Sequence, residues 1–101
     1  TLTVLEMLED LGFCKKGEGG DFVSGGRIGL GGELPVNPDG GGLSSNHPGM
    51  RGLFLLIEAT RQLRHECGPR QVQDARIGIC HGTGGTIGGR HSGGTAILAR
   101  D

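Results

Sequence analysis

A histidine lies just ahead of the most apolar segment of the chain, within SSNHPG, residues 44–49. Pro48 suits the first turn of a helix, so the stretch predicts that His47 lies at a helix N-terminus. Unpaired backbone N–H groups and the positive end of the helix dipole lower the pKa of an imidazole at such a place. A neutral imidazole can accept a proton from a thiol, as a general base does. The same residues also fit a plain helix start in which Asn46 caps the helix and His47 points into solvent.

A cysteine followed by glycines forms a second candidate, CHGTGG over residues 80–85. The preceding stretch ARIGIC, residues 75–80, predicts a strand, and open α/β sheets bind ligands beyond the carboxyl ends of their strands. Cys80 is therefore a candidate acid or base, and N–H groups freed by a glycine turn are candidate donors to an oxyanion. A buried structural cysteine before a turn fits equally well. A phosphate-binding loop fits poorly, because GK[ST] is missing and no helix is predicted to follow.

Composition limits the classes of partner. The 10 Lys and Arg against 11 Asp and Glu leave a formal net charge of -1, without the basic surplus that a nucleic acid or an anionic membrane requires. The longest apolar run, Leu53 to Ile57, is too short to span a bilayer. The 3 cysteines are odd in number and form no CxxC pair, which favours reduced thiols in the cytoplasm over disulfides or a zinc site. We therefore expect no metal, no nucleic acid partner and no membrane span.

The N-terminal third predicts a helix followed by a glycine-rich loop. Apolar residues recur at helical spacing over residues 1–13, and Thr3 with Glu6 has the form of a capping box. Residues 14–32 are rich in glycine and charge, which predicts a surface loop with a short edge strand over 27–30.

Residues 48–66 predict the main helix, which the Gly68–Pro69 pair is expected to close. Its first half is apolar on every face, and a helix of that kind must be buried on all sides. We infer that two layers enclose it, one of them from another domain or subunit. Residues 75–80 and 94–100 predict strands, the second buried on both faces. The order of elements predicts an α/β layered fold.

Two stretches, VNPDGGGLSSNHPG and ICHGTGG, resemble active-site motifs of the thiolase superfamily, specifically of its sterol-carrier-protein-x or lipid-transfer-like branch. The second stretch fits the C-x-G motif through Cys80 and Gly82. The opening EDLGFCKKGEGGDFV is similar to the same branch, so the resemblance covers nearly the whole chain. The first stretch resembles N-x-x-G-G-x(3,4)-G-H-P-x-G, with Asn37, Gly40, Gly41, His47, Pro48 and Gly49 on matching positions. It departs from that pattern at Asn46, where the family has glycine, and at Met50–Arg51, where small residues usually follow.

The resemblance implies that residues 1–101 are the C-terminal portion of a thiolase-like α/β domain, with a mixed sheet and a buried helix after the histidine motif. It implies that carbon–carbon bonds are made or cleaved next to a coenzyme A thioester, through an acyl-cysteine whose cysteine lies in the missing N-terminal half. His47 would activate that cysteine and help bind a thioester oxygen. Cys80 would shuttle a proton at the substrate α-carbon, and the Gly82 N–H would belong to an oxyanion hole. His81 competes with Cys80, because this branch often lacks the cysteine.

The resemblance further implies that coenzyme A enters as a thioester substrate, with no covalently bound cofactor. The implied partners are the N-terminal thiolase half and a second copy in a homodimer, so this chain alone is expected to be inactive. A rival within the branch is a retro-aldolase on steroid side-chain coenzyme A esters, paired with a small zinc-ribbon and OB-fold protein. Another rival is a non-catalytic module that binds acyl-CoA or lipid.

Overall fold

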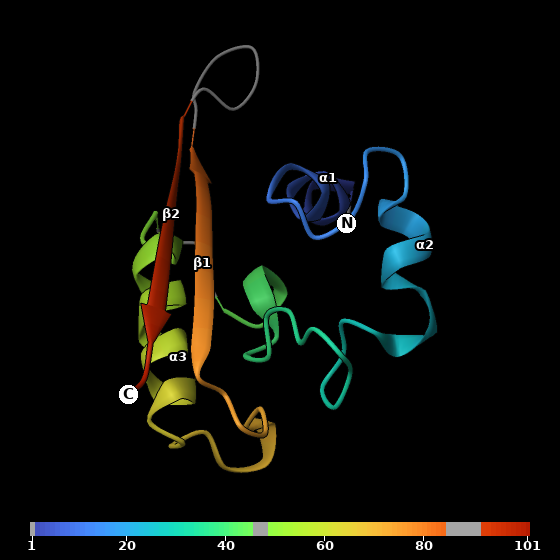
Figure 1. Cartoon of the computed structure of the whole chain (residues 1–101). Helices are drawn as coiled ribbons and strands as arrows, with labels where there is room; N and C mark the ends of the chain where they lie inside the picture. The colour runs from blue at the N-terminus through green and yellow to red at the C-terminus, as the bar shows by residue number, and fades with distance from the viewer. Residues whose placement is uncertain (1, 46–48, 85–91) are drawn as a thin grey trace. The chain divides into compact units, whose positions relative to one another are not determined.

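The computed structural model describes residues 2–45, 49–84 and 92–101. The chain divides into two compact units, Thr1–Val36 and Asn37–Asp101. Figure 1 shows the helices and strands of each unit. Both candidate motifs lie in the second unit, which is therefore the one that positions the site.

The first unit contains the helices α1 (Leu2–Asp10) and α2 (Gly19–Val23) and the 3-10 turn η1 (Ser24–Gly26). Gly12 has a φ of 88° just past α1, the conformation of a glycine that ends a helix. A Cβ added at Gly19 would lie 3.2 Å from the carbonyl oxygen of Leu5, so this glycine lets α2 approach α1 closely.

Two expectations for this unit are wrong. Helix α1 begins at Leu2, so Thr3 is a helical residue and not the cap of a capping box. Residues 27–30 form turns in place of an edge strand. The physical reason is the backbone of the flanking glycines, since Gly26 (φ 76°) and Gly31 (φ 82°) lie in the left-handed region and interrupt extended chain.

The second unit packs helix α3 (Arg51–Leu63) on an antiparallel hairpin of β1 (Ile77–Gly84) and β2 (Ser92–Ala99). Figure 1 shows the helix and the two strands running alongside one another. Short 3-10 turns precede and follow the helix, at Gly41–Leu43 (η2) and Gly68–Arg70 (η3). The α/β class is confirmed, although the sheet within the described residues is antiparallel and two-stranded, not mixed.

Helix α3 is shorter than the predicted 48–66 at both ends. Met50 caps its N-terminus, and the positive φ of Gly49 (78°) keeps that residue out of the helix. At the other end His65 adopts a φ of 58°, and its N–H donates to the Gln62 carbonyl at 3.1 Å. The Glu66 N–H donates to the Arg61 carbonyl at 3.0 Å. These two bonds form a Schellman motif, which ends the helix before the Gly68–Pro69 pair is reached.

Burial is less complete than the apolar pattern predicts. The expectation that the second strand is buried on both faces is wrong, because Ile97 of β2 is 69% exposed. Met50 and Leu53 are each 54% exposed, so the first half of α3 is not enclosed by the described residues. Among those residues, no helix is both long enough and apolar enough to cross a membrane.

The Schellman motif generates a stability prediction, because His65 pays the steric cost of a Cβ in the left-handed region. His65→Gly removes that Cβ, and we expect it to raise the free energy of unfolding by about 1 kcal/mol. The urea midpoint, followed by circular dichroism of the helix, measures the change. His65→Ala keeps a Cβ and should give no gain. A His65→Gly protein that unfolds more easily than the parent contradicts the prediction.

Candidate functional site

The predicted base and its neighbours Asn46 and Pro48 cannot be placed, because residues 46–48, including His47, lie outside the described residues. Residues 85–91 of the glycine linker lie outside them as well. The chain on both sides of this segment is described. On its N-terminal side is a turn, and on its C-terminal side is the first turn of α3.

Asn37 begins the tight turn before the histidine segment. It has a positive φ of 50°, and its carbonyl accepts the Gly40 N–H at 2.9 Å. Gly40 has a φ of 94°, and a Cβ there would collide with the Ser44 side chain. The motif positions Asn37, Gly40 and Gly41 therefore serve the turn, which only glycine can make at position 40.

An ion pair joins this turn to the start of α3. Arg51 Nη1 donates to Asp39 Oδ2 at 3.0 Å, and Nη2 donates to Oδ1 at 3.3 Å. The Gly41 N–H also donates to Oδ1, at 3.0 Å. Burial alone would raise the pKa of Asp39, but the bonds from Arg51 and Gly41 outweigh it and hold the pKa below its ordinary value.

A second ion pair lies further along the helix. Arg70 Nε and Nη2 each reach the Glu58 carboxylate at 2.9 Å, and the side chain of Glu58 is only 9% exposed. The Cys67 thiol donates to the same carboxylate at 3.3 Å. The hydrogen bonds from Arg70 are the main cause that lowers the pKa of Glu58. Burial, followed by Glu58, raises the pKa of Cys67.

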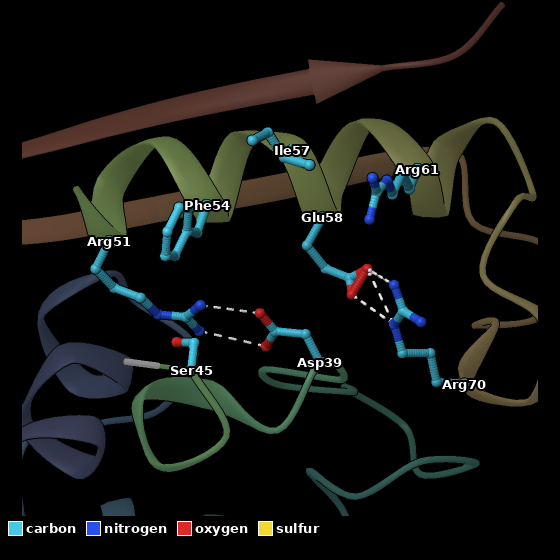
Figure 2. Close-up of a pocket in the computed structure, with 8 residues that line it drawn as sticks. All are labelled: Asp39, Ser45, Arg51, Phe54, Ile57, Glu58, Arg61 and Arg70. Carbon is cyan, nitrogen blue, oxygen red and sulfur yellow. Dashed lines mark hydrogen bonds and ion pairs between the residues drawn. The ribbon is translucent and has the colours of Figure 1, made fainter. Parts of the chain in front are cut away.

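Both ion pairs line one cavity of about 290 Å³ on the side of α3. Figure 2 shows the Asp39 and Glu58 carboxylates, each turned toward its arginine. Phe54 and Ile57 supply apolar lining. The remaining lining residues are Ser45 and Arg61. The cavity therefore combines an apolar wall with two charge pairs and the additional cationic side chain of Arg61.

Cys80 and His81 lie on opposite faces of β1, because successive side chains of a strand alternate. Cys80 faces α3, where it is 8% exposed and its thiol donates to the Leu55 carbonyl at 3.5 Å. His81 Nδ1 lies 2.7 Å from Thr95 Oγ1, across the hairpin on the other face. Burial raises the pKa of the Cys80 thiol. His81 therefore cannot take the place of Cys80 on the helix-facing side without a change of strand register.

The predicted strand end at Cys80 is wrong, because β1 continues to Gly84. The strand extends because Gly82, Thr83 and Gly84 pair with residues of β2 instead of forming a turn. Gly82 faces α3 like Cys80, since a Cβ there would lie 3.9 Å from the Cα of Gly52.

The Gly82 N–H has a direction that bears on its predicted role. Antiparallel ladders alternate between pairs that exchange backbone hydrogen bonds and pairs that do not. Beyond the ladder, the Arg100 N–H donates to the Arg76 carbonyl at 2.8 Å, so this pair is of the bonded kind. Because bonded pairs recur at every second residue of the ladder, the pair of Gly82 with Gly94 also exchanges backbone hydrogen bonds. The Gly82 N–H is thus directed toward β2, and its use as an oxyanion donor requires this end of the hairpin to open.

Sequence reasoning missed the four residues that form ion pairs in the cavity wall, Asp39, Arg51, Glu58 and Arg70. Two signals were available in the sequence. Asp39 and Arg51 have opposite charge and flank the histidine motif on either side. Glu58 interrupts the apolar run of the helix, which is typical of a buried charge with a partner. In residues 2–45, 49–84 and 92–101, no cluster of three or more His, Cys, Asp or Glu is placed to hold a metal ion.

Comparison with known families decides what these motifs belong to. A family model described as thiolase C-terminal domain-like matches residues 1–100. The chain belongs to this family. An acetyl-CoA acetyltransferase of Methanothermobacter thermautotrophicus is 48% identical over 82 residues, which is 80% of this chain and 21% of that protein. Sterol carrier protein 2 of Bos taurus is 43% identical over 82 residues, 80% of this chain and 15% of that protein.

A third relative is named for a different activity. The 17-hydroxy-3-oxo-4-pregnene-20-carboxyl-CoA lyase of Mycobacterium tuberculosis is 49% identical over 60 residues, 59% of this chain and 15% of that protein. The chain thus spans about a fifth or less of the length of these three relatives. The thiolase resemblance of the chain is confirmed at the level of the family.

The buried Glu58 carboxylate generates a pH prediction. Because its folded pKa is lowered, the stability that it contributes is fully present above its ordinary value of 4.5 and is lost as pH falls through the folded pKa. Glu58→Gln should cost about 2 kcal/mol of unfolding free energy at pH 7. Its disadvantage relative to the parent should shrink at acid pH, as measured by urea unfolding at a series of pH values.

Glu66→Gln is the matched control, because Glu66 forms an ion pair with Arg64 in which the two side chains are 47% and 67% exposed. Exposed pairs contribute little. Equal pH dependence in the two variants would contradict a special role of Glu58.

Proposed function

We propose that this chain is the base-carrying part of a thiolase-type acyltransferase that acts on acyl-CoA thioesters. The observation that carries the proposal is the family match over residues 1–100. The resemblance of NHPG and of Cys80 with Gly82 to thiolase motifs supports it. The acetyl-CoA acetyltransferase relative supports the same reaction class.

In the proposed thiolytic cleavage His47 takes the proton of the nucleophilic cysteine, and the thiolate attacks the 3-oxo carbonyl of a 3-oxoacyl-CoA. The bond between that carbonyl carbon and the α-carbon breaks to leave an acyl-cysteine, and the α-carbon of the departing thioester takes a proton from Cys80. The thiol of a second coenzyme A then takes the acyl group and frees the cysteine. The state of Cys80 suits this role, because burial raises the pKa of its thiol and keeps the proton on sulfur near neutral pH. The Gly82 N–H is the proposed donor to the developing oxyanion, and in this role the end of the hairpin at Gly82 and Gly94 must open.

We propose that the nucleophilic cysteine comes from another part of a longer protein. Burial, followed by Glu9 and Glu18, raises the pKa of Cys14, so this thiol lacks the cationic surroundings that favour a thiolate. Cys67 is 3% exposed and its thiol donates to a carboxylate, which also disfavours ionisation. Neither cysteine is activated as a nucleophile.

The proposed partner is an N-terminal thiolase half that covers the exposed apolar side chains of α3, in a protein that also forms a homodimer. We place this protein in the cytoplasm, because all three of its cysteines here are free thiols.

The proposal predicts how acetoacetyl-CoA thiolysis responds to substitution. The 101-residue chain alone should show no turnover. In the complete protein, His47→Ala should lower kcat by about 10²- to 10⁴-fold, because a general base contributes that much. Cys14→Ala is the control and should leave kcat unchanged. Turnover by the isolated chain that depends on Cys14 or Cys67 would show that the nucleophile is not missing.

The lyase relative favours one second candidate, a lyase that acts on steroid side-chain coenzyme A esters. For this candidate we propose a retro-aldol cleavage and a small zinc-ribbon and OB-fold partner, as the resemblance to the branch implies. That reaction keeps His47 and makes Cys80 dispensable. In the complete protein, Cys80→Ala should therefore lower thiolysis about as strongly as His47→Ala if the protein is an acyltransferase. If it is a lyase, Cys80→Ala should keep full activity on a hydroxyacyl-CoA substrate while His47→Ala loses it.

A non-catalytic acyl-CoA or lipid-binding module is the remaining alternative. Calorimetry of the complete protein with an acyl-CoA, combined with absence of turnover on either substrate class, would favour it over both enzymes.

A further inference from the structure

We propose that Asp39 and Arg51 are positioning residues, whose ion pair holds the two ends of the histidine segment at a fixed separation. What they position rests on the proposed function of His47, but the tether itself can be tested without any activity. Asp39 precedes the segment, Arg51 follows it, and the pair closes a loop between residues 12 apart in sequence.

Two hydrogen bonds hold the two groups of the pair in one relative orientation. Two bonds of 3.0 and 3.3 Å run from the Arg51 guanidinium to the two oxygens of Asp39, so the planar groups orient each other as well as attract. The bond from the Gly41 N–H to the same carboxylate fixes it to the turn. Figure 2 shows the two groups facing each other beside the first turn of α3.

The degree of burial separates this pair from ordinary surface pairs. The Arg51 and Asp39 side chains are 16% and 21% exposed. Those of Arg64 and Glu66 are 67% and 47% exposed. Water competes much less for the first pair, so its geometry persists longer than that of an exposed pair.

The position of Arg51 is unfavourable for the helix itself. Cations at a helix N-terminus oppose the macrodipole, and the first turn of α3 contains no acidic residue to compensate. An arginine there makes physical sense when a carboxylate outside the helix approaches it, as Asp39 does. The ion pair therefore stabilises the contact between the turn and the helix, and not the helix alone.

The composition of the segment between Asp39 and Arg51 gives a reason for an ion pair between its ends. Four of the residues between Asp39 and Arg51 are glycine, at positions 40, 41, 42 and 49. Glycine loses more conformational freedom on ordering than any other residue, so a glycine-rich segment holds its shape only if its ends are fixed. Fixing the ends reduces the entropy that a base within the segment must lose to reach a substrate.

Amide hydrogen exchange of the 101-residue chain tests the tether. Arg51→Ala should speed exchange in residues 42–49 by roughly five- to tenfold, while exchange in β1 stays unchanged. Asp39→Asn keeps an oxygen for the Gly41 N–H and should have nearly the same effect, which separates charge from turn geometry. The reversed pair, Asp39→Arg with Arg51→Asp, should recover part of the protection. Arg64→Ala is the matched control and should not affect this segment.

The outcomes are distinct. Faster exchange throughout the chain means that Arg51→Ala unfolds the protein. In that case the tether is tested by the exchange of residues 42–49 in Asp39→Asn and in the reversed pair. Unchanged exchange in residues 42–49 of these variants, with the rest of the chain intact, overturns the tether whatever the protein catalyses.

Kinetics of the complete protein test whether the pair acts through His47. Arg51→Ala should lower kcat for thiolysis about tenfold with KM nearly unchanged, and Arg51→Lys should restore part of the loss. In a His47→Ala background Arg51→Ala should have no further effect, because there is no base left to position. A full additional loss in that background overturns the positioning role. Full activity of His47→Ala itself refutes the proposed function and leaves the exchange result standing.

Discussion

The close approach of α3 to β1 is the constraint on which the second unit depends. Small residues lie where the two elements meet, and a Cβ added there would make ordinary van der Waals contact. A Cβ on Gly78 would lie 3.7 Å from the Ala59 side chain, and one on Gly82 would lie 3.9 Å from the Cα of Gly52. Between these points the Cys80 thiol reaches the backbone of the helix at Leu55. The same contact therefore fixes the helix on the strand and removes the thiol from water, which is what keeps it protonated.

Helical geometry gives the other faces of α3 separate tasks. Arg51, Phe54, Glu58 and Arg61 recur at helical spacing and line the cavity of Figure 2. Met50, Leu53 and Ile57 recur in the same way on an exposed apolar stripe, and Ile57 also borders the cavity. The helix thus has the sheet on one side, the cavity with its two ion pairs on the next and exposed apolar surface on the third, so its first half has apolar residues on several faces. The bare stripe is the surface that our proposal assigns to the other half of a thiolase.

The sequence predicted what depends on local pattern, and failed where a contact distant in sequence decides. Helix α3, the two strands and the turn at Gly40 follow from periodicity and glycine chemistry. The end of α3 at His65 was missed because a histidine in the left-handed region leaves no mark in the sequence, unlike glycine. The extension of β1 past Cys80 was missed because pairing with β2 overrides the turn preference of its glycines. The ion pair of Asp39 with Arg51 was missed because it forms only when the fold brings residues 12 apart in sequence into contact.

The pKa shifts of the titratable groups in the second unit leave a pH range that suits the proposed chemistry. Asp39 and Glu58 have lowered pKa values, so their contribution to folding is complete above the ordinary values of 3.8 and 4.5. The pKa of Cys80 is raised from 9.0, so its thiol carries a proton throughout the range below that value. Between these limits both ion pairs are formed while Cys80 can still give up a proton. Burial against α3 raises the pKa of the thiol, whereas the hydrogen bonds from Arg51 and Arg70 outweigh burial and lower the pKa of the two carboxylates beside the same helix.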